Sequence, residues 1–141
     1  MTWSDVFNVM AAKVYLEQAR VRKEICSKYG MNELEVELLF AVGTTTEFPK
    51  GRDGGKEEAS PGEIQVAYPT LHGPSISLYS EKLVKRGLLA KKEDAHDQRV
   101  KQLSLTDRGE RVFSEVAEMY KQSLYNIKIE HINKGKEQLL R

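Results

Sequence analysis

The sequence has little of several residue types that mark particular classes of protein. Its one cysteine, Cys26, excludes an internal disulfide framework and suits a reducing compartment. No apolar run is long enough to cross a bilayer, since Glu37 interrupts the stretch Val36–Val42. Met1–Met10 lacks the basic residues that open a secretory signal peptide. We therefore expect a cytoplasmic protein that does not enter a membrane.

The residue groupings that most enzymes need are also missing. His72, His96 and His131 share no ligand spacing, so we predict no metal site. There is no glycine-rich phosphate loop, no nucleophile elbow and no pair of catalytic carboxylates. We predict that the protein is not an enzyme and has no cofactor. Because the net charge is only +1, a nucleic-acid partner has to be argued from local clusters of positive charge.

The 141 residues, of which 40% are hydrophobic, fit one domain or one domain with helical extensions. Apolar periodicity predicts a long helix over residues 5–29, which Gly30 ends. Asn32 and Glu35 form a predicted capping box that opens a second helix. The threonines and glycines of Thr44–Glu58 predict a flexible loop.

After the loop, Ser60-Pro61-Gly62-Glu63 forms a predicted capping box for a short helix, which ends before Pro69. Pro74 opens a further helix that Gly87 ends. Residues 88–92 and 100–105 are strand-like and flank a polar tip at 93–99. Thr106 caps a long helix to about Tyr125, and residues 133–141 are predicted to form one more short helix.

A helix, a turn, a helix and a two-stranded ribbon make the winged helix-turn-helix arrangement, in which the second helix enters the major groove. Three runs resemble the signature of the MarR family of transcriptional regulators: Leu83–Leu89, Asp94–Arg99 and Leu103–Gly109. The similarity covers about Ser60–Gly109. It implies a mainly α fold with a small β-wing: a winged helix-turn-helix DNA-binding domain over 32–109, with the loop at 45–58, and a helical dimerisation region formed by 1–31 and 110–141.

The predicted DNA-binding residues lie on the second helix and on the ribbon. Hydroxyls and cations on the helix can meet phosphates or base edges, and Leu78 can meet a thymine methyl group. The family's wing arginine corresponds to Arg99, which Asp97 would orient. The full set is Ser75, Ser77, Leu78, Lys82, Lys91, Lys92, Arg99 and Lys101.

Each of these features also has an explanation that involves no DNA binding, and these explanations stay open. The helix residues can be merely solvated, the wing can be a polar hairpin, and Lys85 and Arg86 can serve only the helix dipole. From Ser60 to Arg108, eight lysines and arginines face six acidic residues, which is a small excess for a DNA-binding surface. A lone cysteine is usually a small buried thiol, although Lys23 and Lys28 near Cys26 leave a redox role open.

The long flanking helices are hard to bury around a winged helix of this size, so we predict a homodimer. Its predicted interface residues are Phe7, Met10, Val14, Met119 and Ile132. A dimer places two recognition helices about one turn of DNA apart, which predicts a pseudo-palindromic operator. The resemblance further implies a repressor released by a small aromatic effector, for which Tyr15, Phe40 and Tyr79 are candidate contacts.

The alternative is a winged-helix protein-interaction module without sequence-specific DNA binding. The small positive excess and the exposed Leu78 favour it. Salt separates the two, because DNA binding weakens steeply as salt rises and such an interaction does not.

Overall fold

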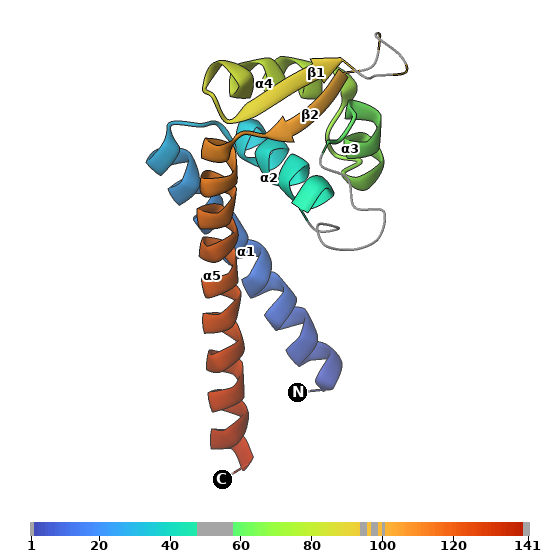
Figure 1. Ribbon diagram of the computed structural model, residues 1–141. Helices are drawn as coiled ribbons and strands as arrows, with labels where there is room; N and C mark the ends of the chain where they lie inside the picture. Colours follow the sequence, from blue (N-terminus) through green and yellow to red (C-terminus); the bar gives the residue numbers. More distant parts are fainter. Residues whose placement is uncertain (1, 48–57, 94–95, 97–98, 100, 140–141) are drawn as a thin grey trace. The chain divides into compact units, whose positions relative to one another are not determined.

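The computed structural model describes residues 2–47, 58–93, 96, 99 and 101–139, without the side chains of 47, 131, 132 and 134–139. Figure 1 shows the elements along the chain, and within these residues they are α1 (Trp3–Tyr29), α2 (Glu33–Glu47), α3 (Pro61–Ala67), α4 (Gly73–Lys85), β1 (Leu89–Glu93), β2 (Lys101–Leu105) and α5 (Asp107–Leu139). The predicted fold class, mainly α with a small β-wing, is confirmed. The chain forms two compact units, Met1–Gly30 with Val116–Arg141, and Met31–Glu115.

The first unit, here called the helical unit, consists of α1 and most of α5. Val21 and Ile25 on α1 and Val116 and Ile127 on α5 are buried. Lys13 on α1 forms an ion pair with Glu130 on α5, with 2.9 Å between Nζ and Oε1. No described helix is long and apolar enough to cross a membrane.

The first helix begins slightly earlier than the sequence predicts. Thr2 caps it, since its hydroxyl accepts from the backbone N–H of Asp5 at 3.2 Å and the Asp5 carboxylate accepts from the Thr2 backbone N–H at 2.9 Å. These hydrogen bonds lower the pKa of Asp5. At the other end, Gly30 adopts a left-handed conformation, with φ at 65°, which confirms the predicted stop.

The second unit, here called the winged unit, packs α2, α3 and α4 against the β1–β2 ribbon (Figure 1). Its core contains Ile64 of α3, Ile76 and Leu83 of α4, and Leu89 and Leu103 of the ribbon, all of them buried. The strands are antiparallel, and Leu89 lies opposite Leu105 while Glu93 lies opposite Lys101. The core therefore fixes the ribbon against α4.

Two other helices extend further at their C-terminal ends than the sequence predicts. Residues 44–47, expected to open the flexible loop, continue α2, and within the helix the hydroxyls of Thr45 and Thr46 donate to the carbonyls of Ala41 and Val42 at 2.7 and 2.8 Å. The separate helix expected at 133–141 is likewise wrong, since α5 runs unbroken to Leu139. An interior glycine such as Gly135 costs a helix only about 1 kcal/mol, which a long helix tolerates. The rest of the expected loop, 48–57, lies outside the described residues.

Candidate nucleic-acid interface

The fourth helix presents a polar face because its other face is anchored in the core. Pro74 stands in its first turn, and Ile76, Ser80 and Leu83 are buried at helical spacing. This anchoring leaves Ser77, Leu78 and Lys82 exposed, while Ser75 is half-buried. Leu78 is a large apolar residue that is 51% exposed, so an apolar base edge such as a thymine methyl can reach it.

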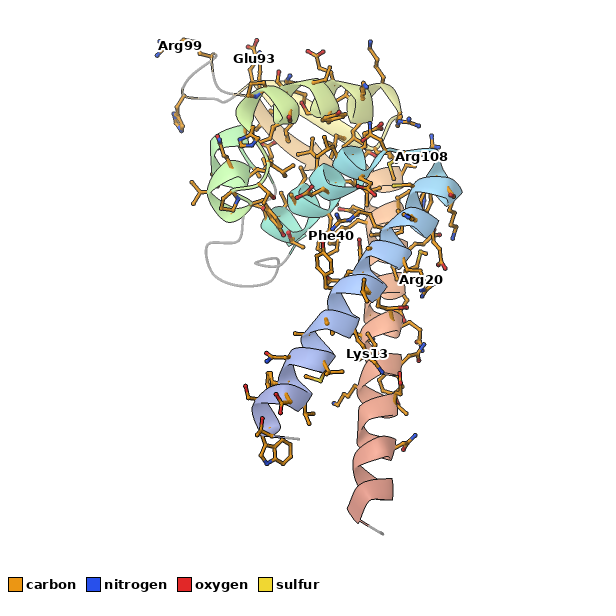
Figure 2. The ribbon with its side chains drawn as sticks, turned by 180° about the vertical axis from the view of Figure 1, so that it is seen from behind. Lys13, Arg20, Phe40, Glu93, Arg99 and Arg108 are labelled. Carbon is orange, nitrogen blue, oxygen red and sulfur yellow. The ribbon has the colours of Figure 1, made fainter. Side chains whose placement is uncertain are left out.

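The wing carries its cations on two different faces. Side chains alternate between the faces of a ribbon, so Lys91 shares a face with Leu89, and its cross-strand partner there is Leu103. Lys101 lies two residues from Leu103 on the same face. Lys92 lies on the opposite face. Arg99 lies beyond Glu93, past the outer end of the ribbon (Figure 2).

A recess of about 410 Å³ lies where the wing, α3 and α4 meet within the winged unit. Its walls combine the first turns of the two helices with the cations of the wing. The lining residues are Ser60, Pro61, Gly62, Gly73, Ser77, Ser80, Lys91, Arg99, Lys101 and Leu103. Three cations and several hydroxyls around one concave surface suit an anionic group such as a phosphate.

The cations of the recess differ in how far acidic neighbours already neutralise them. Lys101 forms an ion pair with Glu93 at 3.0 Å, and Lys92, outside the recess, lies 3.9 Å from Glu58. No acidic side chain in the described part of the chain pairs with Lys91. Lys91 is therefore the lysine of the wing with the most charge to offer an incoming anion.

The recess joins four of the predicted DNA-binding residues, Ser77, Lys91, Arg99 and Lys101. The other four lie apart from it: Leu78 and Lys82 are exposed on α4, Lys92 is on the other face of the ribbon, and Ser75 is half-buried. The Lys82 ammonium lies 5.2 Å from the centre of the Tyr79 ring, a cation–π contact. Asp97, the expected partner of Arg99, lies outside the described residues.

Sequence reasoning missed the contribution of α3 to the recess. Ser60 and Gly62 line it, but the sequence marks them only as a helix start. Ser60 does cap α3, since its hydroxyl accepts from the Glu63 backbone N–H at 3.2 Å. The same capping box places both residues at the N-terminal end of α3, where Gly62 is exposed and Ser60 is half-buried.

The candidate effector contacts have different surroundings. Tyr15 belongs to the helical unit and is 73% exposed. In the winged unit, the Phe40 ring packs on Phe113 with 5.5 Å between the ring centres. Tyr79 is half-buried beside Lys82. Phe40 and Phe113 are both half-buried, so this contact is an aromatic pair at the edge of the core.

The predicted dimer residues lie on α1 and α5 in the helical unit. Phe7 is 67% exposed, and Met10, Val14 and Met119 are half-buried. The side chain of Ile132 lies outside the described residues. Large apolar side chains are exposed along both helices of this unit, namely Trp3, Phe7, Val9, Tyr15, Leu16, Leu124, Tyr125 and Ile129.

The remaining candidate chemistry is limited. The side chain of Cys26, the one cysteine of the sequence, is half-buried. Among the described residues, no three histidine, cysteine or acidic side chains gather as metal ligands would.

No protein-family model matches the chain, and no curated protein sequence matches it either. Several solved structures do match the fold of this chain. The S. aureus MepR–DNA complex superposes with a TM-score of 0.62 at 14% identity, over 96% of this chain and 98% of that one. The reduced form of E. coli MarR gives 0.64 at 12% identity, over 100% and 98%. YusO from Bacillus subtilis gives 0.58 at 18% identity, over 98% and 99%.

The chain has the MarR-like winged-helix fold. This confirms the fold that the sequence signature implies. The MarR-like fold accounts for the whole chain, because each comparison covers nearly all of it and nearly all of the other protein. At such low identities the roles of single residues have to come from this chain's own geometry.

Proposed function

We propose that this chain is a DNA-binding transcriptional regulator that reads double-stranded DNA with α4 and its wing. The observation that carries the proposal is the recess between them, where Lys91, Arg99 and Lys101 surround the exposed Ser77. A phosphate in this recess would lie beside the exposed residues of α4, which can then meet base edges. MepR, which has the same fold, is seen in complex with DNA.

We propose that the regulator acts as a homodimer in the cytoplasm. Two-fold pairing of the helical unit would cover the large apolar side chains exposed on α1 and α5. Repression relieved by a small aromatic effector is the finer proposal, supported by the family resemblance. Tyr15 and Tyr79 are its candidate contacts, whereas Phe40 packs on Phe113.

Selection of bound duplexes from a random DNA library tests the proposal. We expect a pseudo-palindromic consensus whose half-sites are about one helical turn apart. The affinity of the selected duplexes, measured again at about 50 and about 200 mM salt, should fall steeply as the salt concentration rises. A folded protein that enriches no sequence would contradict the proposal.

That outcome would favour a protein-interaction module. The observation in its favour is exposed apolar surface within the winged unit, where Val66 on α3 is 83% exposed and Leu78 on α4 is 51% exposed. Binding through such a surface should change little between the two salt concentrations, because it releases few counterions.

The dimer is tested by placing a charge on the exposed apolar face of α1. Phe7→Asp should weaken the dimer about 100-fold or more, because two-fold symmetry places two carboxylates in an apolar contact. Sedimentation over a range of protein concentrations measures the shift to monomer. Asn8→Asp is the matched control, since Asn8 is exposed on the same helix and gains the same charge. A Phe7→Asp variant that dimerises as tightly as Asn8→Asp would exclude this face from the interface.

A further inference from the structure

Glu35, at the start of α2, is a buried carboxylate whose charge its local role does not require. It is 3% exposed. One oxygen, Oε1, completes the capping box by accepting from the Asn32 backbone N–H at 3.5 Å, and the Asn32 side chain accepts from the Glu35 backbone N–H at 2.8 Å. A glutamine can also complete a capping box, although a carboxylate in the first turn adds an attraction to the helix N-terminus. The burial of a full charge at this position needs a further explanation.

That explanation is Arg86, at the end of α4. The Glu35 Oε2 atom lies 2.7 Å from the Arg86 Nε atom. Because Oε2 accepts no hydrogen bond in the described part of the chain, the contact is an ion pair rather than a directed hydrogen bond. An isolated buried carboxylate is costly, and Arg86 compensates the charge.

Arg86 stands at the junction between the recognition helix and the wing. It is the C-cap residue of α4, and Gly87, with φ at 75°, turns the chain toward β1. The Arg86 carbonyl accepts from Arg108 at 3.3 Å, and the Gly87 carbonyl accepts from the Thr106 hydroxyl at 2.6 Å. The first turn of α5 thus holds the backbone of the junction, and α2 holds its side chain through Glu35.

We propose that Glu35 and Arg86 are positioning residues, whose ion pair fixes the α4–β1 junction so that the helix and the wing meet one duplex in a set mutual orientation. This rests on the proposed function in DNA binding. It assigns Arg86 a different role from a phosphate contact. The pair is half-buried, since the Glu35 side chain is 4% exposed and the Arg86 side chain is 40% exposed. Such a pair adds little net stability, but a junction geometry that separates the two charges leaves the Glu35 carboxylate buried without compensation.

The first experiment measures DNA binding by the full-length protein on a selected duplex and on an unrelated one. Glu35→Gln keeps the cap and removes the charge, and Arg86→Gln removes the partner. Each should weaken specific binding about tenfold, in line with the coupling energies of contacting residues. Non-specific binding and its dependence on salt should not change. The double variant should lose no more than either single variant, because both break one pair.

Glu33→Gln is the matched control. Glu33 lies in the same first turn of α2, is exposed, and loses the same charge. It should bind like the unmodified protein. If Arg86 instead contacts a phosphate, Arg86→Gln alone would flatten the salt dependence by about 0.9 per contact, and Glu35→Gln would have no effect. That result would overturn the proposal.

The second experiment needs no DNA. Amide hydrogen exchange should quicken in Glu35→Gln at Arg86, Leu88 and the first residues of β1, relative to the amides of α3. Unchanged exchange at the junction would overturn the positioning role even if the protein binds DNA. Faster exchange in a protein that binds no DNA would refute the proposed function, while the role of the pair at the junction would stand.

Discussion

Removing Lys91 and Arg99 together should weaken DNA binding by about 100- to 1000-fold at physiological salt, through four lost phosphate contacts in a dimer. Both side chains line the recess between the wing and α4. The slope of the logarithm of affinity against the logarithm of salt concentration should become shallower by about 4, since each lost contact accounts for about 0.9. Titration of a labelled operator by Lys91→Ala with Arg99→Ala at several salt concentrations measures both quantities.

The other wing lysine that lines the recess, Lys101, provides a comparison for Lys91. Lys101 already pairs with Glu93, so a phosphate has to compete with that carboxylate. Lys101→Ala should therefore flatten the salt dependence less than Lys91→Ala does. This order follows from the charges around each lysine and not from their distances along the chain.

Lys121→Ala with Lys128→Ala is the charge-matched control for the wing variant. Both lysines are exposed on α5, in the helical unit. Their loss should leave the slope nearly unchanged if contact with the duplex, rather than net charge, drives binding. Equal losses in the control and the wing variants would mean that the wing makes no phosphate contact.

Helix starts could be predicted from the sequence because they depend on neighbours three residues apart. The capping boxes at Asn32 and at Ser60 are both present. Thr106 also caps α5, since its hydroxyl accepts from the Gly109 backbone N–H at 3.0 Å. The sequence predicts helix ends less well where no glycine or proline marks them. Thr44–Glu47 continue α2 although β-branched residues disfavour helix, which shows that context outweighs propensity there.

The candidate interface was predictable in its parts but not as a site. The wing cations and Ser77 stand out in the sequence, and strand alternation alone separates Lys91 from Lys92. The recess brings in α3, whose placement depends on contacts distant in sequence. The Glu35–Arg86 pair was hidden for a related reason. In the sequence, the capping box accounts for Glu35 and the C-terminus of a helix accounts for Arg86. Only the fold brings the two side chains together as an ion pair.

Gly109→Ala should destabilise the winged unit by about 2 to 3 kcal/mol, a large effect for the addition of one methyl group. The sequence suggests only that a glycine is tolerated in the first turn of α5. The structure gives a different reason for it: a Cβ atom at Gly109 would lie 2.0 Å from the carbonyl oxygen of Leu88. That oxygen accepts from the Thr106 backbone N–H at 3.1 Å, so it cannot move away without breaking the junction between the wing and α5.

Denaturant unfolding of Gly109→Ala measures the loss, and Gly62→Ala is its control. Gly62 also lies in the first turn of a helix, but its added Cβ would meet nothing closer than the Ser60 hydroxyl at 3.9 Å. Alanine there should be neutral or should stabilise by up to about 1 kcal/mol, since it favours helix over glycine. If both variants unfold like the unmodified protein, the close approach of α5 to Leu88 is not maintained in solution. If Gly109→Ala alone is destabilised, the first turn of α5 is held tightly against Leu88, the residue that precedes β1.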